Sequence, residues 1–265
     1  MRALIAIFFA FFALIPWFGL AQERPPGAET SQPPQQRQLG TELRNLQMHL
    51  AQDEHILQDW PNLARYREEN EKLKAAEPRE ERVVFMGDSI TDAWGRTHGK
   101  FFPGKPYVNR GISGQTTPQM LIRFRPDVID LKPKAVVILA GTNDIAGNTG
   151  PETLAGIEGN LASMVQLAQA NHIRVILASV MPVCDCFVPQ TGKRPPAQIV
   201  TLNAWIKDYC GQNGLVYLDY YSAMVDDKGM LKKDLTYDGL HPNDAGYDLI
   251  SPLASAAIAK ALASP

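Results

Sequence analysis

Short apolar runs alternate with amphipathic segments along residues 82–265. Five runs are too short for helices and predict buried strands: Val83–Met86, Pro106–Asn109, Ala135–Ala140, Ile173–Val180 and Leu215–Leu218. Apolar residues recur at helical spacing in four segments: Pro118–Asp130, Pro151–Ala170, Ala197–Tyr209 and Asn243–Leu262. Strands that alternate with helices predict an α/β domain with a parallel sheet and right-handed crossovers.

The first residues have the pattern of an export signal. Arg2 precedes an almost wholly apolar stretch, Ala3–Phe18, and small residues follow at Gly19 and Ala21. We therefore expect a signal peptide at residues 1–21 and a secreted or periplasmic protein. The apolar stretch is short for a bilayer span, so no membrane span is expected in the mature protein. The alternative is an uncleaved N-terminal anchor.

Two further regions precede the predicted domain. Residues 22–39 are rich in Pro, Gln and Glu and predict a disordered linker. Residues 40–76 predict a helical appendage, with leucines at helical spacing and a break at Pro61. This appendage is expected to cover a cleft, to pair two subunits or to act as a spacer, and the sequence leaves the oligomeric state open.

Composition excludes several classes of protein. The chain has 265 residues, a formal net charge of −2 and no basic run, so nucleic acid is not an expected partner.

The chain's three cysteines allow one disulfide and leave one thiol. A bridge between Cys184 and Cys186 spans one residue and is expected to be strained, and Cys210 is a possible partner for either. A metal site would lack a fourth ligand, so neither a metal nor a cofactor is predicted.

Short polar residues and glycines follow the predicted strands, at the edge where parallel sheets bind ligands. The clusters are Gly87–Thr91, Asn109–Gly114, Gly141–Asp144 and, before the last helix, Asp238–Pro242. Together they supply a hydroxyl, an imidazole, a carboxylate and amide donors. Acyl transfer requires this set: a serine nucleophile, a histidine base, a carboxylate that orients the histidine, and donors for the oxyanion.

The four clusters resemble the blocks of the SGNH hydrolase superfamily, also called GDSL esterases, with Ile90 in place of the family's leucine. The resemblance implies a three-layer α/β/α sandwich with a five-stranded, flavodoxin-like parallel sheet. It also implies a triad of Ser89, Asp238 and His241. Its oxyanion hole would consist of the backbone N–H groups of Ser89 and Gly111 and the side-chain amide of Asn143.

The substrate class is less closely defined. Residues 84–94 resemble the branch that includes platelet-activating-factor acetylhydrolase-like proteins and bacterial carbohydrate acetylesterases, which implies short acyl esters of a small molecule or a polysaccharide. The alternatives are a lysophospholipase or thioesterase, a phosphate-ester hydrolase, and a non-catalytic carbohydrate-binding protein. The Gly-x-Ser-x-Gly elbow of α/β-hydrolases is missing. The long loop within Met181–Pro196 is expected to line the substrate cleft.

Overall fold

The computed structural model describes residues 34–75 and 81–263, and it divides the chain into two units, Met1–Leu50 and Ala51–Pro265. The predicted signal peptide, residues 1–21, lies outside the described residues, as do residues 22–33 of the predicted linker. Among the described residues, no helix has the length and apolar character needed to cross a membrane.

Two helices precede the sheet. Helix α1 (Pro34–Gln58) begins inside the range predicted to be linker, and α2 is Arg67–Ala75. The chain turns between them at Asp59–Asn62, which agrees with the break predicted at Pro61. Proline has no N–H to continue a helix, and Asn62 has a left-handed backbone with φ 55°.

The sheet has five parallel strands: β1 (Val83–Gly87), β2 (Tyr107–Gly111), β3 (Ala135–Leu139), β4 (Arg174–Ala178) and β5 (Val216–Leu218). Their order is β2-β1-β3-β4-β5, which confirms the predicted fold class. In this register Gly87 lies opposite Gly111 on one side and Leu139 on the other. The segments that follow β1, β2 and β3 therefore leave the sheet at one edge.

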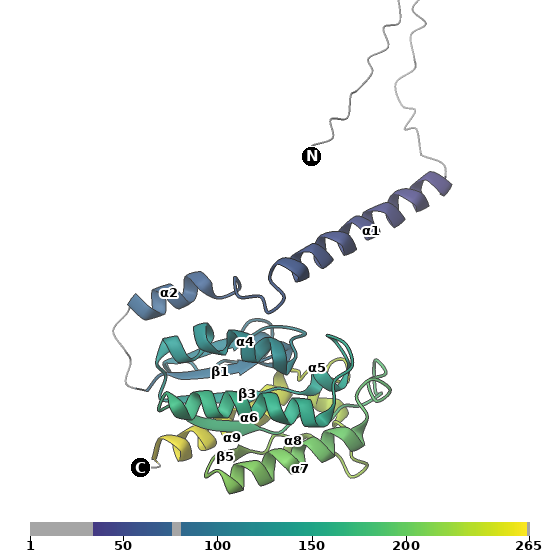
Figure 1. Ribbon diagram of the computed structural model, residues 1–265. Coiled ribbons are helices and arrows are strands. Elements are labelled where there is room, and N and C mark those ends of the chain that lie inside the picture. The colour runs from purple at the N-terminus through teal and green to yellow at the C-terminus, as the bar shows by residue number, and fades with distance from the viewer. Residues whose placement is uncertain (1–33, 76–80, 264–265) are drawn as a thin grey trace, which may run out of the picture. The chain divides into compact units, whose positions relative to one another are not determined.

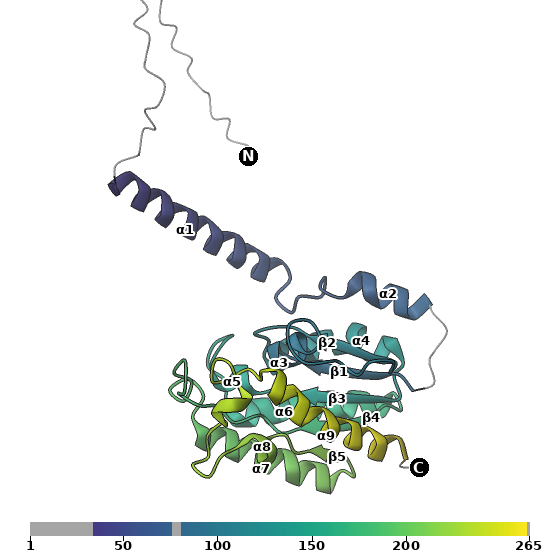
Figure 2. The same ribbon diagram turned by 180° about the vertical axis from the view of Figure 1, so that it is seen from behind.

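Helices cover both faces of the sheet. Figure 1 shows α4 (Thr117–Asp127), α6 (Leu154–Ala170) and α7 (Pro196–Gln212) on one face, and Figure 2 shows α3 (Ser89–Ala93) and α9 (Asp244–Ala263) on the other. Alternate strand residues enter two separate cores, so both faces of each strand are apolar. The remaining elements are short: α5 (Thr142–Ile145), α8 (Tyr221–Met224) and the 3-10 turns η1 (Ile129–Leu131) and η2 (Lys233–Leu235).

The long elements match the sequence predictions to within a few residues, whereas α3, α5 and α8 were not predicted. Each has five residues or fewer, which is too short to show helical periodicity.

A buried guanidinium joins α4 to the carboxyl edge of the sheet. The Arg123 side chain is fully buried and forms an ion pair with Asp127, Nη1 to Oδ2, at 2.9 Å. It also donates to the carbonyl oxygens of Arg110 at 2.8 Å and Gly87 at 3.0 Å, and to Oε1 of Gln115. Gly87 is the last residue of β1 and Arg110 the last but one of β2, so Arg123 fixes the backbone next to Ser89. Removing a partner from such a buried ion pair costs about 3–5 kcal/mol.

Helix α2 is attached to the same cluster. Asn70 donates to Asp127 Oδ1 at 2.7 Å and accepts from Arg110 Nε at 2.9 Å. The Tyr66 hydroxyl, just before α2, donates to the carbonyl of Gly111. The segment from Tyr66 to Asn70 is therefore packed on the α/β domain by buried polar contacts.

The structure also pairs the cysteines. A disulfide joins Cys184 to Cys186, which the sequence had marked as a strained pairing, and Cys210 remains a free thiol inside the core. Burial raises the pKa of Cys210 to about 11, so this thiol is protonated at neutral pH.

Candidate active site

Ser89 is the first residue of α3 and directly follows β1. The preceding residue, Asp88, is the N-cap, and its carboxylate accepts the N–H of Ile90 at 3.0 Å. The backbone N–H of Ser89 lies in the first turn of the helix and has no hydrogen-bond acceptor among the described residues. The strand-to-helix turn thus presents a hydroxyl and a free N–H at the edge of the sheet.

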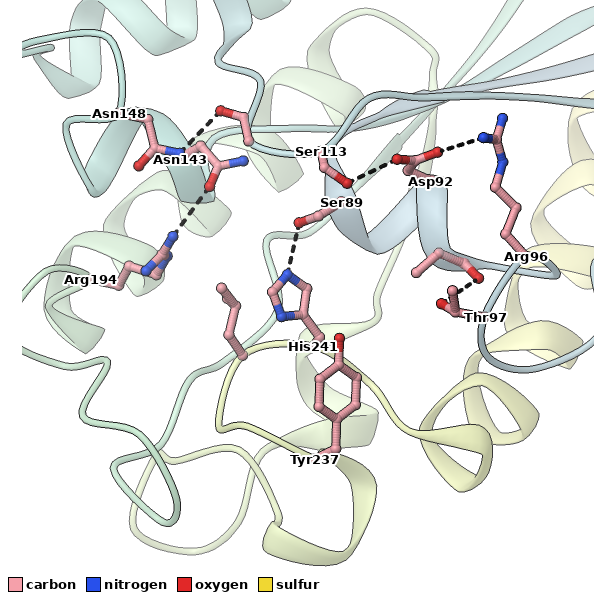
Figure 3. A pocket seen from close by; sticks show the side chains of 13 residues that line it. Ser89, Asp92, Arg96, Thr97, Ser113, Asn143, Asn148, Arg194, Tyr237 and His241 are labelled. Atoms are coloured by element: carbon pink, nitrogen blue, oxygen red, sulfur yellow. Dashed lines mark hydrogen bonds and ion pairs between the residues drawn. The ribbon is translucent and has the colours of Figure 1, made fainter. Parts of the chain in front are cut away.

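The three predicted triad residues lie in one hydrogen-bonded line (Figure 3). Ser89 Oγ is 2.9 Å from His241 Nε2, and His241 Nδ1 is 2.6 Å from Asp238 Oδ2. The other carboxylate oxygen of Asp238 accepts the backbone N–H groups of Leu240 at 2.9 Å and His241 at 2.8 Å. Asp238 thereby fixes both the histidine ring and the turn that carries it.

The charge of Asp238 determines the histidine tautomer. Partial burial works to raise the pKa of this carboxyl, but the hydrogen bonds from His241 and Leu240 outweigh it and hold the pKa below its usual range. An ionised carboxylate accepts the proton on His241 Nδ1. The lone pair of Nε2 then faces the Ser89 hydroxyl, which is the orientation a general base requires.

Asn143 lies in α5, immediately after β3, and its side-chain amide is held at both ends. Its Nδ2 donates to the carbonyl of Gln115 at 3.0 Å, and its Oδ1 accepts from Arg194 Nη2 at 3.2 Å. Because a guanidinium only donates, Arg194 fixes which end of the amide is the oxygen. Arg194 also donates to Thr142 Oγ1 at 3.1 Å. The remaining Nδ2 hydrogen faces Asp88 at a long 3.4 Å.

These side chains line a cavity of about 520 Å³, seen from close by in Figure 3. Most of its lining residues are polar: Ser89, Asp92, Arg96, Thr97, Ser113, Asn143, Asn148, Arg194, Tyr237 and His241. The others are Ala93, Gly114 and Leu240. Arg194 comes from the Met181–Pro196 loop, which confirms that this loop lines the cleft. The same loop forms hydrogen bonds to the turn that carries Asp238 and His241. Cys184 N donates to Gly239 O at 2.9 Å, and Val188 N donates to Asp238 O at 3.2 Å.

The structure does not bring Gly111 into the cavity. Its N–H already donates to Asn109 Oδ1 at 2.9 Å. A Cβ at this position would lie 2.1 Å from Asp92 N, so the glycine is explained by the close approach of α3 to β2. The prediction of Gly111 as an oxyanion donor therefore disagrees with the geometry.

Gly114, three residues further on, differs from Gly111 in each of these respects. It lines the cavity, has φ 80°, and its N–H meets no acceptor among the described residues. The Ser113-Gly114 dipeptide is a turn signal that could have pointed to it. The choice between two nearby glycines depended on where β2 ends, and the strand runs two residues past the predicted Asn109. Arg194 carried no signal beyond its place in a long loop.

Among residues 34–75 and 81–263, no three His, Cys, Asp or Glu side chains form a group suited to a metal ion. Trp94 is a packing residue, because its ring contacts Phe85, Phe102 and Tyr247 in a buried cluster.

Comparison with known proteins identifies the family. Residues 85–249 match the model of the GDSL-like lipase/acylhydrolase family, so the chain belongs to that family. A GDSL-like lipase from Bacteroides thetaiotaomicron has a similar structure, with a TM-score of 0.71 and 46% sequence identity. The match covers 76% of this chain and 99% of that one.

Two curated relatives match over shorter ranges. The uncharacterized lipoprotein YqeF from Bacillus subtilis is 35% identical over 81 residues, which are 29% of this chain and 33% of that protein. The platelet-activating factor acetylhydrolase IB subunit alpha2 from Gallus gallus is 30% identical over 122 residues, 43% of this chain and 49% of that protein. The chain thus spans about a third and about half of the lengths of these two relatives.

Asp88 gives the site a testable pH dependence. Complete burial raises its pKa to about 6, with the Ile90 N–H opposing the shift. The folded protein therefore keeps this proton at pH values where the unfolded chain, with a pKa of about 3.9, releases it. The stabilisation is complete below about pH 4 and is lost as pH rises through about 6.

Asp88→Asn has no proton to lose, and asparagine still caps a helix. We expect the free energy of unfolding of the wild type to fall, relative to this variant, between pH 4 and pH 7.

Urea denaturation at both pH values measures the difference. The control is Asp208→Asn, which makes the same change on the exposed side of α7. For Asp88→Asn, we subtract the variant's free energy of unfolding from that of the wild type at each pH. A difference that is the same at pH 4 and pH 7 would contradict a raised pKa of the buried Asp88 carboxyl.

Proposed function

We propose that this member of the GDSL-like lipase/acylhydrolase family hydrolyses short-chain carboxylic esters of carbohydrates through an acyl-enzyme on Ser89. The observation that carries the proposal is the unbroken Ser89–His241–Asp238 line of hydrogen bonds at 2.9 and 2.6 Å. A serine hydroxyl becomes a useful nucleophile when a base of this kind takes its proton.

The first half of the reaction forms the acyl-enzyme. Ser89 Oγ attacks the ester carbonyl carbon as its proton moves to His241 Nε2, and the carbonyl oxygen becomes an oxyanion. Asp238 stabilises the imidazolium that results. When the tetrahedral intermediate collapses, the bond to the alcohol oxygen breaks, and that oxygen takes the proton from Nε2.

The second half restores the enzyme. A water molecule gives a proton to Nε2 and attacks the acyl carbon. Collapse of the second tetrahedral intermediate breaks the bond to Ser89 Oγ, which recovers the proton. The carboxylic acid leaves, so one ester and one water become one acid and one alcohol.

We assign three donors to the oxyanion: the N–H groups of Ser89 and Gly114, and the Nδ2 hydrogen of Asn143 that faces Asp88. At 3.4 Å its contact with Asp88 is the longer of the two Nδ2 hydrogen bonds, and the oxyanion would replace Asp88 as its acceptor. Both backbone groups lack an acceptor among the described residues, and Arg194 holds the Asn143 amide in one orientation. Donors fixed in advance stabilise developing charge without reorganisation, and each is worth about 100- to 1,000-fold in rate. Gly114 replaces Gly111 because the Gly111 N–H is already bonded to Asn109.

The lining of the cavity favours a short acyl group and a hydroxyl-rich alcohol. Only Ala93 and Leu240 among its lining residues are aliphatic, whereas Asp92, Arg96 and Ser113 are among those that are polar or charged. A long acyl chain gains about 0.8 kcal/mol for each CH₂ that it buries in apolar surroundings, and only two aliphatic side chains line this cavity to receive it. The acetylhydrolase name of the Gallus gallus relative agrees with a short acyl group.

An acyl-length series tests the proposal. We expect kcat/KM for p-nitrophenyl esters to fall from acetate to butyrate to octanoate, because most of the cavity's lining residues are polar and a longer chain would lie against them. We expect Ser89→Ala to lower kcat by more than about 10⁴-fold on acetate, since removal of the nucleophile disables the whole triad. Ser255→Ala, on α9, is the matched control and should retain full activity.

Three outcomes would change the account. Activity that rises towards octanoate would favour a lysophospholipase or thioesterase. Activity that survives the loss of Ser89 would overturn the triad. The absence of activity on every ester, in a protein that is folded by circular dichroism, would leave a non-catalytic carbohydrate-binding role.

We also propose that the protein is exported. The apolar stretch Ala3–Phe18 follows Arg2 and ends near small residues, and one relative is named a lipoprotein. N-terminal sequencing of protein recovered from the periplasm or medium of an expressing bacterium should start at Gln22. Recovery of the protein only in the cytoplasm, with residues 1–21 retained, would contradict export.

A further inference from the structure

A second cavity, of about 600 Å³, adjoins the catalytic one. Three residues line both cavities: Ser113, Gly114 and Asn148. The outer wall of the second cavity comes from the turn between α1 and α2, where Asp59, Trp60 and Asn62 face it. A substrate that extends past Gly114 therefore reaches a surface formed by a segment that precedes the sheet in the sequence.

Hydrogen bonds hold this turn in place on the domain. Gln119 Nε2 donates to the Trp60 carbonyl and Gln115 Nε2 to the Pro61 carbonyl, both at 2.7 Å. The Asp59 carboxylate accepts the N–H groups of Leu63 and Ala64, each at 2.8 Å. The wall is thus part of the folded hydrolase unit and is available to bind a ligand without prior ordering.

The Trp60 indole has no partner in the described part of the chain. The ring is half-buried and lines the cavity, yet its Nε1–H donates no hydrogen bond and its face contacts no other ring. Trp94 and Trp205, in contrast, pack against aromatic neighbours. A half-buried indole that lines a cavity and has a free donor offers both an apolar surface and a polar contact to a ligand.

The second cavity is poorly suited to an anionic ligand, because no positively charged residue is among its described lining residues. Asp59 is its only ionisable lining residue among the described residues, and two backbone amides already engage that carboxylate. The other polar lining groups are the amides of Asn62, Gln115, Gln119 and Asn148 and the hydroxyls of Ser113 and Thr149. A phosphate or carboxylate group would meet no cation there. Hydroxyl groups, which both donate and accept, match amides and hydroxyls.

We propose that the second cavity is a carbohydrate subsite. It binds a neutral sugar unit next to the acylated one, with that sugar packed against Trp60 and its hydroxyls bonded to the side-chain amide of Asn62, which has no partner among the described residues. This inference rests on the proposed function, because it places the ester of the same substrate at Ser89. It predicts selectivity for acetylated oligosaccharides over esters with small alcohols.

The test compares two substrates within each protein. We measure kcat/KM for partially acetylated xylo-oligosaccharides and for p-nitrophenyl acetate, and we take the ratio of the two. In Trp60→Ala this ratio should fall about 10-fold, mainly through KM for the oligosaccharide, because a lost stacking contact weakens binding. Trp60→Phe, which keeps an aromatic face, should restore most of the ratio.

The matched control is Trp205→Ala. That indole stacks on Tyr209 at 4.7 Å and lines neither cavity, so its loss should leave the ratio unchanged. An unchanged ratio in Trp60→Ala, an equal fall in Trp205→Ala, or a wild type that cleaves p-nitrophenyl acetate but no acetylated oligosaccharide would overturn the subsite. Failure of the wild type on both substrates would instead overturn the proposed function.

A second measurement does not depend on turnover. Unacetylated xylotetraose, titrated into Ser89→Ala protein, should bind in a calorimeter, and the added change Trp60→Ala should abolish the heat. Binding that is the same with and without Trp60, or no binding by the Ser89→Ala protein, would contradict the subsite.

Discussion

The close approach of α3 to the ends of β1 and β2 is the constraint on which the site depends. A Cβ at Gly87 would lie 2.1 Å from Thr91 Oγ1, and one at Gly111 would lie 2.1 Å from Asp92 N, so only glycine fits at either strand end. This contact fixes where Ser89 emerges. Arg123 supports it from the other side by bonding the carbonyl oxygens of Gly87 and Arg110. The serine is thus held by a rigid backbone, which supports catalysis because reacting groups must be placed before the substrate arrives.

The rest of the site is brought to that serine by segments that are distant in the sequence. Asn143 follows β3, and Asp238 and His241 lie in a turn before α9. The Met181–Pro196 loop connects Asn143 to the turn that carries Asp238 and His241. Arg194 donates to Asn143, while Cys184 and Val188 donate to the backbone of that turn. Parallel strands that end at one edge make this assembly possible. The turn at Asp59–Asn62 extends the same surface beyond the cavity around Ser89.

The sequence predicted the elements whose pattern is long enough to be periodic, together with the residues that carry distinctive chemistry. The five strands, the four long helices, and the positions of Ser89, Asn143, Asp238 and His241 at strand ends and turns follow from hydropathy and from clusters of short polar residues. Gly114 could not be separated from Gly111, because that choice depended on the last residue of β2 and on which N–H was already bonded. The contact between Arg194 and Asn143 could not be predicted, because the two residues are 51 positions apart and only the fold brings them together. The position of Trp60 beside Gly114 likewise arises only in the fold.

The central claim is that Ser89 is the activated nucleophile, and a covalent probe tests it most directly. A fluorophosphonate reacts with a serine whose proton is taken by a base, forming a phosphorus–oxygen bond and releasing fluoride. The cavity also contains Ser113, whose hydroxyl donates to Asp92 at 2.8 Å and has no histidine beside it. Peptide mapping by mass spectrometry should find one adduct, on Ser89, and none in His241→Gln. An adduct on Ser113, or an unmodified Ser89 in folded protein, would contradict the account.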